Sequence, residues 1–312
     1  TTFGILATSS INISGGNPGS LFGAKDGNDL DSKIGILGVN HFKQLNTKSY
    51  LSSSIGLNYS KTDQINYHSD RVTSTSFARD ESNVAKSSYN IATTFHSKIN
   101  AKTFVKIGLQ NEIIGLNLYY RTKQSIDADW LQIWDYNSAT NLSQGFAHLK
   151  YSFNDRWSIN AGLHAQYFFL NASKAVEPRL GIKYDLNEKS SFNFGYGLHA
   201  QMQPINVYFL QSQNADGTIS CNNENLDFTK SHHFVFGYDI NPVKDWRLKA
   251  ELYYQYLYDV PVNTFSSSYS MLNTGASFKT ELEDRLTNAG TGQNYGVELT
   301  IEKFCSKGYY GL

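Results

Sequence analysis

The chain has 312 residues, and its 27 Lys and Arg balance its 27 Asp and Glu, so the formal net charge is zero. A neutral chain gives no electrostatic reason to expect nucleic acid as a partner. Charged residues make up only 17% and aromatic residues 14% of the chain, whereas soluble domains carry about 25% charged residues. This composition, with only 5 Pro, favours many long strands over helices.

No run of about 18 apolar residues is present, which excludes a transmembrane helix. The N-terminus begins at Thr1 without Met, a basic region or a cleavage site, so we expect a signal peptide to be absent or already removed. Cys221 and Cys305 fall at opposite ends of the strands predicted below. They are therefore expected to lie beyond the ~6 Å Cα separation of a disulfide.

Apolar and polar residues alternate with a period of two through most of the chain, which predicts strands. In 51–59, for example, Ile55 and Leu57 share one face while Ser54 and Asn58 share the other. In chain order, the pattern predicts strands at 3–13, 32–44, 48–60, 88–98, 102–113, 142–153, 157–169, 179–186, 190–202, 231–241, 246–258 and 291–304, and a last strand starting at 308. Helical periodicity never persists for three turns, so the predicted fold class is all-β.

The links between these strands alternate strictly between short and longer ones. The short links are 44–48, 98–102, 153–157, 186–190, 241–246 and 304–308, and the longer ones are 14–31, 61–87, 114–141, 170–178, 203–230 and 259–290. In an antiparallel up-and-down meander every second link lies on the same rim, so one rim has tight turns and the other has long loops. Outer-membrane barrels show this asymmetry.

The lengths of the strands and the aromatic residues at their ends agree with a membrane barrel. A tilted strand crosses a bilayer in about 9–11 residues, and most of the predicted strands are that long, whereas soluble strands average about 5–6 residues. Phe153, Trp157 and Trp246 lie beside short links, and Tyr59 and Tyr167 lie toward longer ones, as two interfacial girdles require. The alternative is that these aromatic residues close the core of a soluble β protein.

Alternation by itself does not say which face meets water. A soluble barrel turns its apolar face inward, whereas a membrane barrel turns it toward lipid and pairs every backbone group between strands. The polar face carries Lys106, Gln110, Glu112, His164, Arg179, Lys183, Asp185, Lys249, Glu251 and Glu298. We expect this face to enclose water, and Ile55, Leu163 and Leu252 to face lipid.

The ends of the sequence predict an incomplete barrel. If the longer links are extracellular, strand 3–13 starts on the periplasmic side and the last strand stops at Leu312, part-way across the membrane. Both terminal strands would then have open edges. We therefore expect 1–312 to be a partial transmembrane β-barrel that lacks a segment upstream and several strands downstream. Thirteen strands already imply a wide pore, and barrels of 16 to 22 strands hold a channel or a plug.

Six segments resemble the barrel of TonB-dependent receptors of the Bacteroidota type, and they follow the family's order through nearly the whole chain. They are 17–23 (NPGSLFG), 175–183 (AVEPRLGIK), 194–204 (FGYGLHAQMQP), 226–234 (LDFTKSHHF), 253–261 (YYQYLYDVP) and 290–300 (GTGQNYGVELT). The resemblance implies a 22-stranded barrel, of which this chain carries about 13 strands. It also implies a carboxypeptidase-regulatory-like domain and a plug upstream, and neither the plug nor a TonB box is visible here.

The resemblance implies an outer-membrane transporter that takes up a scarce solute actively, without a cofactor. The implied partners are the lipid bilayer, the protein's own plug, the TonB complex and a surface lipoprotein. Iron chelates, cobalamin, glycans and peptides all remain open as cargo. Two other functions remain open as well: a passive large porin or export channel, and a surface adhesion protein anchored by its barrel.

Several polar residues are candidates for contact with a plug or a solute inside the barrel: His164, Gln166, Glu177, Arg179, His199, Gln201, Gln203, Asn206 and Tyr208. Glu177 and Arg179 share one face of a strand whose start Pro178 marks, and a structural ion pair is the competing interpretation. For the row that begins at His199, simple hydration of the wall is the alternative.

The predicted loop 114–141 contains five aromatic residues that could stack on a ring-shaped ligand: Tyr119, Tyr120, Trp130, Trp134 and Tyr136. The alternative is that they form the small core of a folded loop. His232 and His233 are adjacent and point to opposite faces of a strand, so no metal site is predicted. No nucleophile elbow, His-Glu-x-x-His motif or Gly-rich phosphate loop is present, so no catalytic residues and no enzyme activity are predicted.

Overall fold

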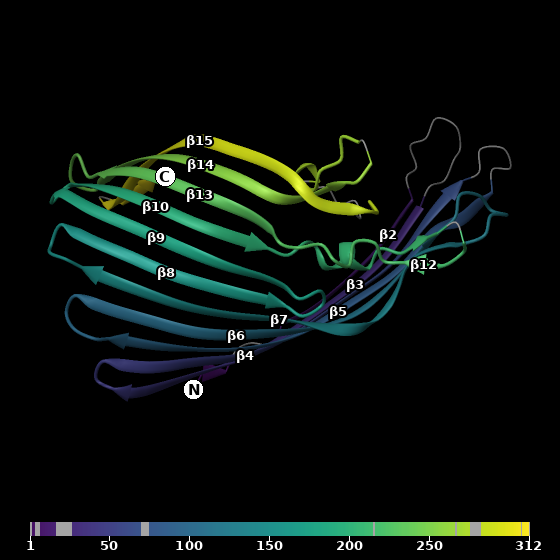
Figure 1. Cartoon of the computed structure of the whole chain (residues 1–312), viewed down its shortest axis with the longest axis horizontal. Coiled ribbons are helices and arrows are strands. Elements are labelled where there is room, and N and C mark those ends of the chain that lie inside the picture. The colour runs from purple at the N-terminus through teal and green to yellow at the C-terminus, as the bar shows by residue number, and fades with distance from the viewer. Residues whose placement is uncertain are drawn as a thin grey trace.

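The computed structural model describes residues 2–3, 7–16, 27–69, 75–214, 216–265, 267–274, 282–306 and 308–311. The strands are β1 Thr2–Phe3, β2 Ala7–Gly16, β3 Gly27–Asn46, β4 Ser49–Ser69, β5 Ser76–Lys98, β6 Thr103–Thr122, β7 Leu131–Ser152, β8 Trp157–Phe168, β9 Ser173–Asn187, β10 Ser190–Gln201, β11 Ser212–Gln213, β12 Ile219–Ser220, β13 Thr229–Ile240, β14 Trp246–Asn263, β15 Leu286–Ser306 and β16 Tyr309–Gly311 (Figure 1). Two 3-10 helices, η1 Ile205–Phe209 and η2 Met271–Asn273, complete the described elements. No helix among the described residues is both long and apolar enough to cross a membrane.

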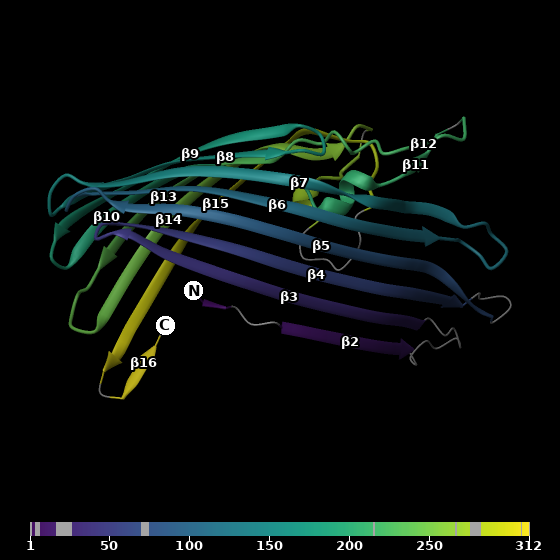
Figure 2. The same ribbon diagram turned by 90° about the horizontal axis from the view of Figure 1, so that it is seen from below.

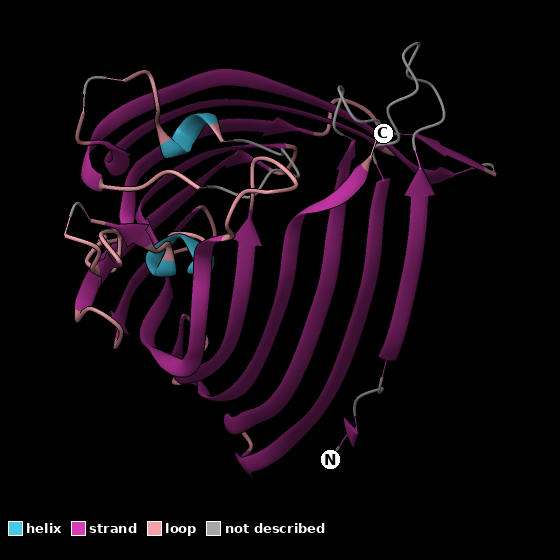
Figure 3. Cartoon of the chain, turned by 90° about the vertical axis from the view of Figure 1, so that its right-hand side faces the viewer, coloured by secondary structure: helices cyan, strands magenta, loops and turns pink. Residues whose placement is uncertain are grey.

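One antiparallel sheet contains every strand except the small hairpin β11–β12. Consecutive strands are neighbours from β3 to β10 and from β13 to β16, while β1 and β2 both pair with β3. The all-β, up-and-down prediction is confirmed. The sheet curves strongly without closing, since within the described residues β16 pairs only with β15 (Figures 2 and 3).

The two rims of the sheet differ as the spacing of the links predicted. Tight turns gather at the left end of Figure 1, and the longer connections lie at the right end. However, the predicted loops 61–87 and 114–141 are wrong in extent, because β4 to β7 are 20 to 23 residues long and continue far into both ranges. The link predicted at 170–178 is only residues 169–172. The resembling segment 17–23 lies outside the described residues.

The period-two pattern misses the upper part of a strand when the apolar face changes sides part-way along. In β6, Glu112 still shares the inner face with Lys106, but from Ile114 onward the inner positions are apolar. Ile113 points outward and is 42% exposed, whereas Ile114 is fully buried. An alternation that shifts its phase does not satisfy the period-two test over the whole strand, so the pattern predicts a loop where the upper half of β6 lies.

The outer face of the lower half of the sheet is apolar and open, as the membrane interpretation requires. Ile55, Leu163 and Leu252 are 54%, 51% and 54% exposed, so they do not pack in a dry centre. The strand register places Lys249 and Glu298 on the opposite face. That face is the concave one, because η1 packs against its upper part (Figure 3). The predicted assignment of the two faces is confirmed.

A charge on the outer face should destabilise the barrel much more than a charge on the inner face. Leu252→Lys places an ammonium group among acyl chains at mid-strand, and we expect the free energy of unfolding to fall by about 2–4 kcal/mol. The matched control Gln255→Lys, on the inner face of the same strand, should change it by about 0.5 kcal/mol or less. Denaturant unfolding in lipid vesicles measures both, and equal losses would contradict the assignment.

Candidate functional site

Strands β9 and β10 separate near the upper end of the inner wall, and the candidate site lies where they part. Their pairing stops at Arg179 opposite Gly197, while β9 continues alongside β8 as far as Ser173. Pro178 is the first residue beyond that point, and its nitrogen has no hydrogen to donate to a neighbour. Pro178 therefore lies inside β9 and not at the start of a strand, which corrects the sequence-based placement.

A buried carboxylate, Glu177, is the centre of this site. Its side chain is only 2% exposed, and three donors surround it. His164 Nδ1 and Gln166 Nε2 lie 2.9 and 2.8 Å from its Oε1 atom, and Arg179 Nη2 lies 2.9 Å from its Oε2 atom. Because a carboxylate only accepts, His164 donates from Nδ1. The same Gln166 amide also donates to the Ala200 carbonyl of β10 at 2.8 Å, so it spans the gap that β9 leaves.

The predicted lumen residues thus divide into two groups. Glu177 and Gln166 are buried and hold the strands together, with His164 beside them half-buried. Arg179, His199 and Gln201 are exposed on the inner face, where they can meet a solute or another part of the protein. Of these residues, Arg179, His199 and Gln201 can therefore hydrogen-bond to a solute or to another part of the protein.

The upper part of the predicted row fastens a connection to the wall. The Gln203 backbone N–H donates to the Tyr208 hydroxyl at 3.0 Å, and the Gln203 amide donates to the Asp227 carbonyl and the Thr229 hydroxyl, each at 3.0 Å. Tyr208 is fully buried, with its ring 5.4 Å from that of Phe168 on β8. Asn206 lies half-buried in η1. The β10–β13 connection is therefore a folded unit of the inner wall.

Most of the five predicted loop aromatics belong to strands. Tyr136 on β7 stacks on Phe209 of η1 with ring centroids 3.8 Å apart, and Tyr120 lies 5.4 Å from Trp134. These three side chains form the core beneath the β10–β13 connection. Tyr119, on the outer face of β6, and Trp130, in the 123–130 loop, stay outside this core. Contact of these residues with a ligand stays a prediction.

The outer rim nevertheless has one arrangement that the sequence did not reveal. The Arg121 guanidinium lies 4.3 Å from the Trp130 ring centroid and 5.8 Å from that of Tyr119. The Lys123 ammonium also lies over Trp130, at 5.0 Å. Both cations stabilise the ring through its π electrons.

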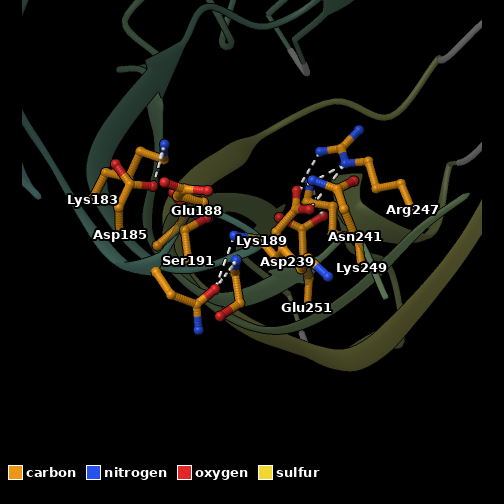
Figure 4. Close-up of a pocket in the computed structure, with 13 residues that line it drawn as sticks. Lys183, Asp185, Glu188, Lys189, Ser191, Asp239, Asn241, Arg247, Lys249 and Glu251 are labelled. Atoms are coloured by element: carbon orange, nitrogen blue, oxygen red, sulfur yellow. Dashed lines mark hydrogen bonds and ion pairs between the residues drawn. The ribbon is translucent and has the colours of Figure 1, made fainter. Parts of the chain in front are cut away.

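A charged cavity near the tight turns, which we name the balanced cavity, was not recognised as a site from the sequence. It measures about 520 Å³ and is lined by Lys183, Asp185, Asn187, Glu188, Lys189, Ser190, Ser191, Asn193, Asp239, Asn241, Arg247, Lys249 and Glu251 (Figure 4). Lys183 pairs with Asp185 at 2.6 Å, and Arg247 lies 2.9 Å from Glu302. Neighbouring i and i+2 residues of opposite charge were the signal that could have indicated it.

The described part of the chain has no group of three or more His, Cys, Asp or Glu side chains arranged to hold a metal ion. Cys221 and Cys305 are both free thiols. The side chains exposed on the inner wall, such as Arg179 and His199, offer charge and hydrogen bonding.

The model of a protein family described as TonB dependent receptor-like, beta-barrel, matches residues 2–311 of the chain. Comparison with curated proteins gave no match. Solved structures with the same fold include the RagAB peptide importer in its closed-closed state, with 12% identity and a TM-score of 0.54 over 91% of this chain. The copper transporter OprC has 9% identity and a TM-score of 0.60 over 97% of the chain. The ferric-catecholate import receptor Fiu from K12 E. coli has 12% identity and a TM-score of 0.59 over 91%.

The chain spans only part of these solved structures, covering 35% of the RagAB chain, 51% of OprC and 46% of Fiu. The similarity establishes a shared fold and leaves the cargo of this protein open.

Replacing the buried carboxylate should weaken the wall more than replacing an exposed one. Glu177→Gln removes the charge that His164 and Arg179 contact, and we expect the free energy of unfolding to fall by about 2 kcal/mol. The control Asp185→Asn breaks an exposed ion pair on the same face of β9 and should cost less than about 1 kcal/mol. Denaturant unfolding compares the two variants, and a larger loss for Asp185→Asn would contradict a bracing role for Glu177.

The β10–β13 connection should loosen in strong alkali. Burial raises the pKa of Tyr208 from 10.0 to about 12, so docking favours the neutral phenol. The stabilisation is complete below pH 10 and is lost as the pH rises through about 12. Tyrosinate absorbance of the wild type minus that of Tyr208→Phe should show one group titrating near pH 12. A difference that titrates near pH 10 would place Tyr208 in water.

Proposed function

Because the chain belongs to the TonB-dependent receptor β-barrel family of the outer membrane, we propose that the protein takes up a scarce solute actively through a plugged barrel. The single observation that carries this proposal is the structure of the inner wall. Below the level of Ile114 it is lined with polar and charged side chains, and above that level a folded connection packs inward against it. A wall of this kind encloses water and narrows on the outer side, where a receptor captures its solute.

We further propose that residues 1–312 form about 13 strands of a 22-stranded barrel. The support is the family match over residues 2–311 together with the larger size of the similar solved chains. A barrel this wide requires a plug to stay sealed, so its own plug and the TonB complex are the partners that follow. The family resemblance of the sequence supports the Bacteroidota type and a surface lipoprotein partner.

The cargo remains within the classes that the resemblance allows. The similar solved structures include a peptide importer, a copper transporter and a ferric-catecholate import receptor, and these cargoes differ widely in size and chemistry. The fold is therefore compatible with peptides, iron chelates, cobalamin or glycans in this protein too.

Two measurements on the full-length protein test active uptake. In planar bilayers we expect it to be nearly silent, because a plug blocks the lumen. In the native cells, deleting the gene should abolish growth when one of four compounds (an iron chelate, cobalamin, an oligosaccharide or a peptide) is the sole source of the nutrient it supplies. Collapsing the proton gradient should abolish uptake of the same compound. Steady conductance would indicate a passive porin instead.

A loop deletion separates transport from adhesion. Removing 124–129 shortens the exposed tip between β6 and β7 without cutting either strand. If the barrel were only an anchor, this deletion would abolish attachment to a surface and leave solute uptake unchanged. Under our proposal, attachment is unaffected and the energy requirement of uptake is retained.

A further inference from the structure

A cavity on the inner wall near the turn between β5 and β6 contains an excess of positive charge. It measures about 490 Å³ and is lined by Lys98, Asn100, Ala101, Lys102, Thr103, Phe104, Lys106, His148, Lys150 and Ser152. No carboxylate lines it. The register explains the concentration of charge, because Lys106 lies directly opposite His148 and Phe104 lies between Lys98 and Lys150. We name this cavity the basic cavity.

None of its four lysines forms an ion pair with any described residue of the chain. Lys102 donates to the Phe153 carbonyl at 3.0 Å, and the Lys106 ammonium lies 5.7 Å from the Phe104 ring centroid. The positive charges gathered in this cavity repel each other, and a bound anion would offset this repulsion.

The balanced cavity shows that charge on this wall is usually neutralised. There Lys183 pairs with Asp185 and Lys249 pairs with Glu251, at 2.6 and 2.5 Å. Arg247 contacts both Asp239 and Glu302. The two cavities lie on the same inner face near the same rim, and only the basic cavity lacks acidic partners.

A second hollow of about 350 Å³ neighbours the basic cavity on the inner wall, and His148 lines both. This hollow is lined by His148, Asn160, Gly162, Arg179, Leu180, Gly181, Gly195, Tyr196, Gly197, His199, His233 and Val235. It too has cationic and imidazole side chains and no carboxylate along its lining. The two hollows together, which we name the basic groove, lead from the exposed Arg179 and His199 toward the tight-turn rim.

The glycines of the groove keep it open, although the backbone does not require them. None of the four has a positive φ. A Cβ atom added at Gly162, Gly181 or Gly195 would have its nearest neighbour at 3.6, 3.7 or 3.9 Å, which is ordinary van der Waals contact, whereas a Cβ atom at Gly197 would lie 2.7 Å from the His199 side chain. The wall could therefore accommodate side chains at Gly162, Gly181 and Gly195, and their absence leaves space in the groove for a ligand.

We propose that the basic groove binds a small anionic solute that bears carboxylate or phosphate groups. This inference rests on the proposed uptake function and names the chemical class of the cargo. The volumes of the two hollows of the basic groove, about 490 and 350 Å³, fall in the range of about 300–1,000 Å³ that small-molecule sites occupy. Unpaired lysines supply the attraction, Arg179 and the imidazoles supply directed donors, and the face of Phe104 supplies an apolar surface for a ring.

Binding to the purified full-length protein tests the groove directly. The probes are benzene-1,3,5-tricarboxylate and inorganic tripolyphosphate, with neutral 1,3,5-tris(hydroxymethyl)benzene as the uncharged comparison, measured by titration calorimetry. We expect an anion to bind and the neutral compound not to bind. The combined Lys98→Gln, Lys102→Gln, Lys106→Gln and Lys150→Gln variant should lose roughly tenfold or more in affinity, and Gly181→Leu should weaken binding by filling the groove.

The matched control neutralises lysines in the balanced cavity. Lys183→Gln with Lys189→Gln and Lys249→Gln should change anion affinity by about twofold or less, since a Debye length of about 8 Å screens distant charges at physiological salt. Equal losses in both variants would show attraction by overall charge only and would overturn the site. A different result would be that the wild type binds no anion and that limited proteolysis releases the plug only from the quadruple variant. This would show that an acidic segment of the plug fills the groove, and it would also overturn the proposal.

The outcomes for site and function are separable. If anion binding responds to the lysine variants but deleting the gene changes no uptake, the groove is retained as a site and the uptake function is refuted. Energy-dependent uptake that is unaffected by the quadruple variant, with no anion bound, would retain the function and refute the groove.

Discussion

The constraint on which the rest of this structure depends is that a backbone surrounded by acyl chains must satisfy all of its hydrogen bonds within the protein. The continuous antiparallel ladder from β3 to β16 does this without help from solvent. Once the backbone is paired, the side chains of the outer face are free to be apolar and exposed, as Leu163 and Leu252 are. Water and charge are then confined to the concave face.

Above the membrane level the same strands obey the opposite rule. There the outer face meets water, and the inner face supports the β10–β13 connection, so the apolar side chains move inward at Ile114. The strands thus continue as one covalent wall while their two faces exchange solvents. This explains how the part of the β10–β13 connection that contains η1 comes to be packed like part of a soluble domain. It also explains why Tyr136 and Trp134 serve packing.

On the concave face, polar side chains have three different uses. Gln166 donates to the Ala200 carbonyl across the gap where β9 and β10 part, and Glu177 accepts from Gln166, so both side chains are used in bracing the wall. The balanced cavity pairs its charges internally. The basic cavity leaves its four lysines without acidic counterparts among the described residues, while Arg179, in the upper hollow of the basic groove, is paired with Glu177. Since the whole chain is neutral, this local excess of positive charge comes from where the residues lie in the fold. It distinguishes a surface that can attract an anionic ligand from one that is only hydrated.

The sequence by itself determined the existence and order of the membrane-crossing strands and the identity of the apolar outer face, because the alternation of side chains along a strand is local and repeats with period two. The family resemblance implied a larger barrel, which we keep as a proposal. Only the tertiary structure decided what depends on neighbours: the extension of β4 to β7, the place of Pro178, and the burial of Tyr208 and Gln203. The basic groove belongs to the same class, because Lys98, Lys106 and Lys150 come together only through the register of β5, β6 and β7, a relation between strands that a single sequence does not contain.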